Sequence, residues 1–220
     1  MTRRIGQLLV GLFLYGFAIA MMIRASCGVA PWDVLTQGIA LHTGIAFGVI
    51  TNIVGVLVLL LWIPIRQKPG IGTVANVLLI GPSVEVGLRM IPELTGLAPR
   101  ILFLAAGLVL VAIATGLYIG ARFGPGPRDG LMTGIHRRLG WPIWAVRTGI
   151  EVTVLAAGWL LGGTAGIGTL AFALLIGPMV NVALPLLRVP EPPRPHRNER
   201  GEPAREFEPI AGDAISSEGL

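Results

Sequence analysis

The sequence predicts an all-α membrane protein with six membrane-spanning helices and two short half or interfacial helices, arranged as two inverted repeats. Hydrophobic residues make up 53% of the 220 positions, charged residues only 13%, and the mean hydropathy is +0.75. Six apolar runs follow one another along the chain, and a pattern of Gly, Pro and Asp residues recurs at a spacing of 96 positions. This composition excludes an ordinary soluble domain.

Each apolar run is long enough to be a transmembrane helix, because about 20 helical residues cross a hydrocarbon core of about 30 Å. The runs cover approximately residues 5–23, 45–65, 71–91, 100–120, 142–162 and 168–188. Two short helices are predicted at 32–43 and 128–139, and neither is long enough to cross alone. His136, Arg137 and Arg138 at the end of the second one favour a position along the membrane surface.

The chain divides into a membrane domain, residues 1–188, and a tail, residues 189–220. The membrane domain holds 13 Lys or Arg and five acids, a net charge of +8, whereas the tail holds four Arg and seven acids, a net charge of −3. Five prolines by Pro203 and no apolar periodicity predict a disordered cytoplasmic tail. A solvated extension is the simplest interpretation of the tail, and recruitment of a partner is the alternative.

The positions of Lys and Arg predict that both termini are cytoplasmic. The cytoplasmic side would receive Arg3, Arg4, Arg66, Lys68, Arg122, Arg128, Arg137, Arg138 and Arg188. The outer side would receive only Arg24, Arg89 and Arg100. Because these residues stand singly or in pairs at the ends of apolar runs, they indicate helix orientation and not a nucleic-acid partner. The predicted location is a bacterial plasma membrane.

The spacing of 96 residues defines repeat 1 at about 4–92 and repeat 2 at about 100–188. It aligns Gly28-Val-Ala-Pro31-Trp-Asp33 with Gly124-Pro-Gly-Pro127-Arg-Asp129, and 13 of the 19 residues from Gly70 to Leu88 equal their counterparts. Three spans per half is an odd number, so the second half is predicted to be inverted. Inverted repeats are common in secondary transporters. A duplication that only builds a helical bundle is the alternative.

Asp33 and Asp129 are counterparts two residues after a proline, and both have two interpretations. Proline suits the first position of a helix, and an Asp in the first turn can accept hydrogen bonds from free N–H groups. Capping would therefore explain both residues. Helix N-termini inside a membrane also hold ions, so contact with a substrate or cation is the second interpretation.

Glu85 and Glu151 lie within apolar runs, where an ionised carboxylate is costly and indicates a functional site by default. The simpler interpretation is a pair of intrahelical ion pairs, Glu85 with Arg89 and Glu151 with Arg147, because each pair is four residues apart. The counterpart of Glu85 is Asn181, so the polar positions differ between the halves. All five residues are candidates for substrate or ion binding.

The third span of each half contains a Gly-Pro pair about ten residues after it begins. Gly81-Pro82 and Gly177-Pro178 are counterparts, and proline inside a helix frees a carbonyl group and bends the helix. Helices broken at matching positions indicate a binding site near the middle of the membrane. A simple kink is the alternative.

No catalytic, cofactor or metal-binding pattern is visible, so the sequence predicts neither an enzyme nor a bound cofactor or metal. His42, His136 and His196 do not have metal-ligand spacing, and no phosphate-binding loop is present. The single cysteine, Cys27, cannot form a disulfide within the chain.

Three segments carry a family resemblance: Gly28-x-x-Pro31-x-Asp33-x-Leu35, Thr43-Gly44, and the junction from Arg66 to Thr73. They resemble the YczE/YyaS/YitT-like group of bacterial integral membrane proteins over roughly residues 1–188. The resemblance implies a plasma-membrane protein of undefined biochemical activity.

The function expected from these features is a carrier or channel for a small solute, with the lipid bilayer as its surroundings. The alternative is a non-transporting membrane accessory protein that assists the assembly or secretion of partners.

Overall fold

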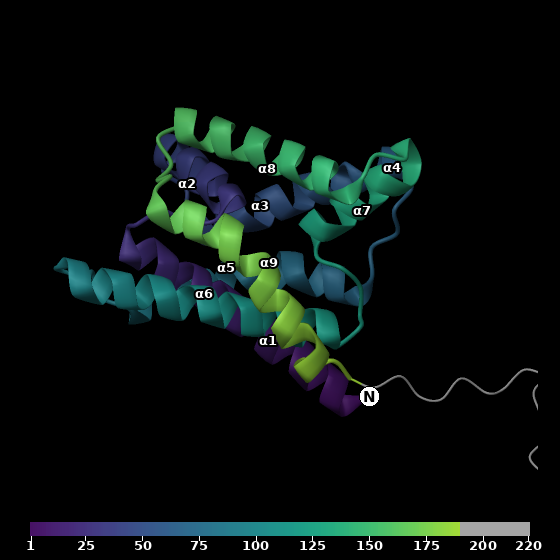
Figure 1. Cartoon of the computed structure of the whole chain (residues 1–220), viewed down its shortest axis with the longest axis horizontal. Helices are drawn as coiled ribbons and strands as arrows, with labels where there is room; N and C mark the ends of the chain where they lie inside the picture. The colour runs from purple at the N-terminus through teal and green to yellow at the C-terminus, as the bar shows by residue number, and fades with distance from the viewer. Residues whose placement is uncertain (190–220) are drawn as a thin grey trace, which may run out of the picture. The chain divides into compact units, whose positions relative to one another are not determined.

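The computed structural model describes residues 1–189, which fold into helices joined by short loops (Figure 1). The helices are α1 (Thr2–Ala25), α2 (Pro31–Thr43), α3 (Phe47–Leu60), α4 (Trp62–Ile65), α5 (Ile71–Met90), α6 (Leu97–Gly120), α7 (Pro127–Leu139), α8 (Ile143–Leu160) and α9 (Ile167–Leu187). This described part of the chain contains no strand, as predicted. The prediction of a disordered tail falls on residues that lie outside it.

Six helical segments are long and apolar enough to cross a membrane. Five of them are α1, α5, α6, α8 and α9, and the sixth is Phe47–Ile65, which combines α3 and α4. The six predicted spans are therefore confirmed, and α2 and α7 are the two short helices, each of 13 residues. The protein is an all-α polytopic membrane protein.

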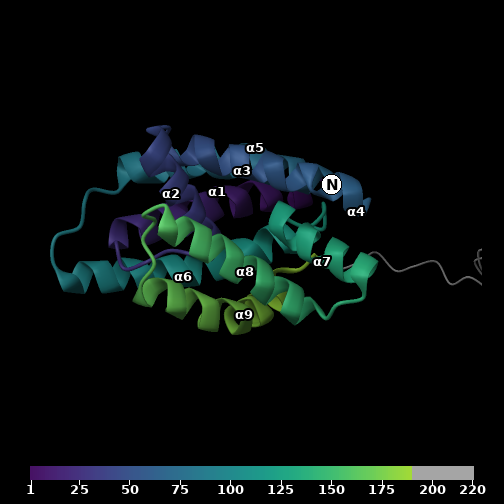
Figure 2. The same ribbon diagram turned by 90° about the horizontal axis from the view of Figure 1, so that it is seen from above.

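Two long helices, α1 and α6, form the centre of the bundle. They run antiparallel, because Gly11 of α1 packs against Leu117 while Gly107 of α6 packs against Met22. The missing side chains at these two glycines let the backbones approach closely. Helix α5 packs on α1, and α9 packs on α6, so that the four helices follow one another as a layer in Figure 2.

The short helices occupy opposite ends of the bundle (Figure 1). Helix α2 packs on α8, where Gly38 lies against Leu161. Helix α7 packs on α3 and α4, where Gly134 lies against Ile65. Both helices therefore cover a helix of the opposite half of the sequence.

The first turn of α7 is packed inside the bundle. Trp62 is only 1% exposed, its indole lies against Gly130, and its Nε1 donates a hydrogen bond to the carbonyl oxygen of Pro127 at 3.0 Å. Glycine at position 130 makes room for the ring. The position of 128–139 along the membrane surface stays a prediction, since this packing fixes the first turn only relative to α4.

The third spans, α5 and α9, begin against loops of the opposite half. The Gly72 N–H donates a hydrogen bond to the Phe123 carbonyl at 2.9 Å, and the Gly168 N–H donates one to the Cys27 carbonyl at 2.7 Å. These groups are among those left free at a helix N-terminus, so each loop satisfies a donor that the helix cannot. The two contacts are counterparts, because Gly72 and Gly168 are 96 residues apart, and so are Cys27 and Phe123.

Replacing Gly130 by alanine is expected to destabilise the protein by about 1–3 kcal/mol. The added methyl group would overlap the Trp62 indole, which is buried and hydrogen-bonded and has no space into which it could move. Thermal unfolding in detergent measures the effect. Gly149→Ala is the control, because nothing lies within 4 Å of a Cβ at that position. Equal melting temperatures for both variants would contradict this packing.

Candidate functional site

A cavity of about 310 Å³ lies where the first turns of α2 and α7 approach each other. Residues from both halves of the sequence line it. Its charged lining residues are Arg128, Asp129, Arg147 and Glu151. Most of the remaining lining is apolar or aromatic, which is typical of ligand pockets that hold a few placed polar groups.

An ion pair joins the two short helices at this cavity. Arg128 Nη2 of α7 donates a hydrogen bond to Asp33 Oδ1 of α2 at 3.3 Å, and the Asp33 side chain is 4% exposed. The Arg128 guanidinium also lies over the Trp32 ring, 5.1 Å from its centroid, in a cation–π contact. Trp32 and Arg128 are counterparts in the two repeats, so equivalent positions of the two halves touch here.

Asp129 has a different partner. Its Oδ2 accepts a hydrogen bond from the Tyr118 hydroxyl of α6 at 3.0 Å, and the Tyr118 ring packs edge-on against the Tyr15 ring of α1. Asp129 lines the cavity and is exposed to it. Both acids lie in the first turn of their helices, where the positive dipole end favours a carboxylate, but the side-chain hydrogen bonds found for them go elsewhere. Both carboxylates instead contact residues of other helices.

Helix α8 contributes the second ion pair of the cavity. Arg147 Nε donates to Glu151 Oε1 at 2.9 Å, four residues apart, as predicted. Both side chains line the cavity, and they are 46% and 23% exposed. Asn181 of α9 lines the same cavity, so the structure brings together four of the predicted candidates: Asp129, Arg147, Glu151 and Asn181.

The predicted ion pair between Glu85 and Arg89 does not form in the described residues. Glu85 Oε1 instead accepts a hydrogen bond from the Gly48 N–H at 2.8 Å, at the start of α3. The N-terminus of a helix carries unsatisfied N–H groups and a positive dipole end, and these attract the carboxylate. Neither Glu85 nor Arg89 lines the cavity. The role of Glu85 in the described structure is to join α5 to α3.

Helix α5 continues through Gly81-Pro82 as one helix, and α3 compensates for the missing N–H of the proline. Because Pro82 has no N–H, the carbonyl oxygen of Leu78 loses its helical hydrogen-bond donor. The side chain of Asn52 in α3 lies at this position. Its Nδ2 is 3.5 Å from the Leu78 oxygen, and its Oδ1 accepts a hydrogen bond from the Gly81 N–H at 3.1 Å. In α9, Gly177 lines the cavity, and a Cβ built there would meet nothing within 4 Å. Of the predicted hinge residues, Gly177 alone lines this cavity, while Gly81, Pro82 and Pro178 lie outside its lining.

The sequence interpretation missed the aromatic residues of the site. Tyr15, Trp32 and Tyr118 line the cavity, and Arg128 crosses it to reach Asp33. The available signal was that Arg128 replaces its counterpart Trp32 beside a retained aspartate. A cation at one copy of a repeated Pro-x-Asp segment, where the other copy has an aromatic ring, indicates a contact between the copies.

Comparison with known proteins finds a family and relatives without an assigned activity. The profile of a family of unknown function, DUF6198, matches residues 2–185. An uncharacterized protein of Haemophilus influenzae is 35% identical over 192 residues, which cover 87% of this chain and 88% of that protein. The uncharacterized membrane protein YczE of Bacillus subtilis is 33% identical over 177 residues, 80% of this chain and 82% of that protein. No solved structure matches the chain.

Proposed function

The chain belongs to the DUF6198 family, whose function is unknown, and we propose that this protein is a carrier for a small solute. Its cavity is the best guide to its role. The cavity where α2 and α7 meet is the observation that supports this proposal most directly. It lies among six membrane-spanning segments and holds charged groups that are costly inside a membrane. Such groups mark substrate or ion paths in transporters.

A duplicated and inverted architecture supports a carrier. The helix bounds of the two halves correspond at a spacing of 96 residues, as for α2 with α7. The hydrogen bonds of Gly72 and Gly168 correspond as well, because each glycine N–H bonds to a loop of the other half. In our proposal, the two halves are inverted copies that give one central site two ways to open, one toward each side of the membrane.

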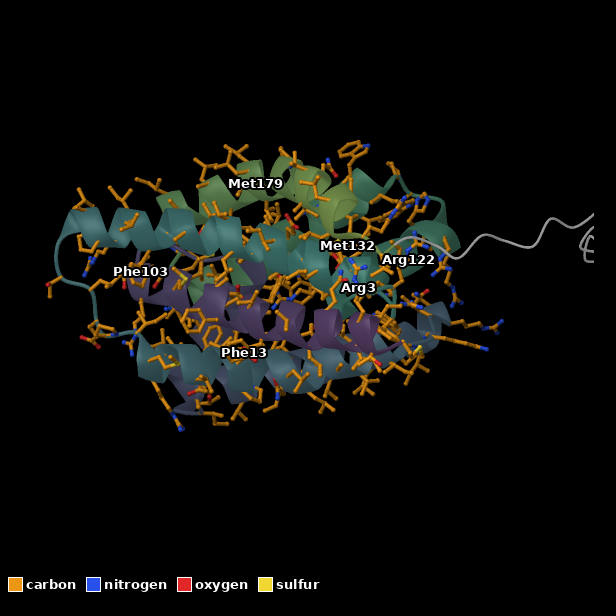
Figure 3. All side chains as sticks on the ribbon, turned by 90° about the horizontal axis from the view of Figure 1, so that it is seen from below. Arg3, Phe13, Phe103, Arg122, Met132 and Met179 are labelled. Atoms are coloured by element: carbon orange, nitrogen blue, oxygen red, sulfur yellow. The ribbon has the colours of Figure 1, made fainter. Side chains whose placement is uncertain are left out.

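We also propose that both termini face the cytoplasm of a bacterium. Arg3 and Arg122 lie at the same end of the bundle (Figure 3), and Arg4 donates hydrogen bonds to the carbonyls of Ala121 and Arg122 at that end. A concentration of Lys and Arg on one side is typical of the cytoplasmic side of an inner-membrane protein.

Labelling of single cysteines from each side of the membrane tests this proposal. In a Cys27→Ala background, Thr115→Cys places a thiol in the cavity, and Lys68→Cys places one in the loop between α4 and α5. An impermeant maleimide is added to right-side-out or inverted vesicles. We expect the cavity cysteine to react from both faces, because a carrier opens alternately, and the loop cysteine to react from the cytoplasmic face only.

Two outcomes would contradict parts of the proposal. A cavity cysteine that reacts from one face under all conditions would contradict a carrier and favour the accessory role. A loop cysteine that reacts from the outer face would overturn the orientation. The loop variant is also a control for the vesicles. Its cysteine must react in one of the two vesicle preparations, which shows that the reagent reaches the protein and does not cross the membrane.

A further inference from the structure

The two halves differ in how their second and third spans meet. Helix α3 packs closely on α5, and Gly81 of α5 lies against the backbone of Gly48. The equivalent helices of the second half, α8 and α9, do not form a packed pair in residues 1–189, and they diverge after their connecting loop (Figure 1). Both of them line the cavity.

The sequence explains this difference. In the first half, Gly48 and Gly55 of α3 leave room for α5, and a Cβ at position 55 would already crowd Val77. Their counterparts in α8 are Trp144 and Glu151, which are too large to allow the close approach that the two glycines permit. Helices α8 and α9 therefore cannot close in the way that α3 and α5 do. Both are candidate membrane spans of which only 11% is buried, so we expect the space between them to face the lipid.

The charges around the cavity leave one carboxylate without a direct ion pair. The site holds two arginines and three acids; Arg128 is paired with Asp33, and Arg147 is paired with Glu151. Asp129 has no ion pair within the described structure, and the Tyr118 hydroxyl is its hydrogen-bonding partner. It is exposed to the cavity, so a positively charged ligand could reach it.

The remaining surroundings of Asp129 suit a quaternary ammonium group. The rings of Tyr15, Tyr118 and Phe172 line the same cavity. Aromatic faces next to a carboxylate attract such cations by cation–π and Coulomb interactions, which strengthen where water is excluded. The apolar lining continues along α9 with Ile176 and Val180, which also pack against the core formed with α1 and α6.

We infer that the substrate class is an organic cation with a single apolar tail, which enters from the bilayer between α8 and α9. Its cationic head lies against Asp129, and its tail lies along α9 past Gly177. This inference rests on the proposed carrier function and specifies the substrate of the same cavity. The head lies against the one acid of the site that has no ion pair of its own, and the tail lies along the apolar lining that α9 contributes.

Binding of two matched amphiphiles tests the inference. Decyltrimethylammonium and decyl sulfate share one tail and carry opposite head charges. Each is titrated below its micelle concentration into the full chain in nanodiscs of zwitterionic lipid, and saturable binding is followed by tryptophan fluorescence and by the rise in melting temperature that a native-state ligand causes. We expect saturable binding of the cation and none of the anion.

Three variants locate the head and the tail. Asp129→Asn removes the charge and is expected to weaken binding of the cation about tenfold or more. Glu85→Gln makes the same chemical change outside the cavity and should leave the affinity within about twofold. Gly177→Leu adds a side chain where nothing lies within 4 Å, so it should fold normally and weaken binding by obstructing the tail.

Each opposite result overturns the inference. Binding of decyl sulfate as tight as that of the cation would exclude the assigned charge, and an unchanged affinity in Asp129→Asn would exclude the assigned head site. An unchanged affinity in Gly177→Leu would exclude the assigned position of the tail along α9. The cysteine labelling at position 115 tests the carrier function, and the binding experiment tests the substrate class. In a carrier for another solute, the cysteine at position 115 would react from both faces, but the protein would not bind decyltrimethylammonium.

Discussion

Replacing Gly81 by alanine will destabilise the protein by about 3 kcal/mol, whereas the same substitution at its counterpart Gly177 will leave stability unchanged or slightly higher. A methyl group at position 81 would overlap the carbonyl oxygen of Gly48 and the side chain of Asn52. Since one of these is backbone, α3 and α5 would have to separate. They would then lose the Asn52 hydrogen bond to the Gly81 N–H as well.

The counterpart position supplies the control for this prediction. Gly177 has the same neighbours in sequence, Ile176 and Pro178, and alanine favours the helix by up to about 1 kcal/mol over glycine. Thermal unfolding of both variants in the same detergent compares the two sites directly. If both substitutions lower the melting temperature equally, α9 is packed at Gly177 as closely as α5 is at Gly81, and the difference between the two halves does not exist.

Replacing Asp33 by asparagine is expected to cost about 3–5 kcal/mol of stability. The substitution keeps the size of the side chain but leaves the Arg128 guanidinium without its counter-ion, with Arg128 only 25% exposed. An uncompensated charge in such a place costs far more than the pair contributes. The free energy of unfolding, measured by titration with a denaturing detergent, gives the magnitude.

The double variant Asp33→Asn, Arg128→Gln distinguishes the cost of the unpaired Arg128 charge from other effects of the substitutions. It should lose less stability than the sum of the single variants, because neither charge is then left alone. The pair of Arg147 and Glu151 is the comparison: it lies within one helix and is more exposed, so its disruption should cost about 1 kcal/mol or less. Strict additivity at Asp33 and Arg128 would show that their contact contributes nothing.

Hydropathy and proline positions were sufficient to predict the helices. A span of about 20 apolar residues has few alternatives inside a bilayer, since its backbone groups must bond to one another. Pro31 and Pro127 marked the starts of α2 and α7, because proline is tolerated at the first helical position. These local signals do not depend on which helices become neighbours.

The contacts of the charged residues depend on those neighbours, and here the sequence was less informative. The i+4 spacing correctly predicted Arg147 with Glu151. The same spacing was wrong for Glu85, because the close packing of Gly48 on Gly81 brings the free N–H groups of α3 within reach. Arg128 reaches Asp33 across 95 residues, and no local pattern contains that information.

The reciprocal loops at Cys27 and Phe123 also constrain the order in which the chain can be completed. Helix α5 is synthesised before residue 123, so the donor at Gly72 remains without its partner until α6 has followed. The donor at Gly168, in contrast, meets a loop that was made at the start. Neither half contains the acceptor for its own third span. The two halves are therefore interlocked during assembly, and a chain that stops after the first half lacks a component of its own structure.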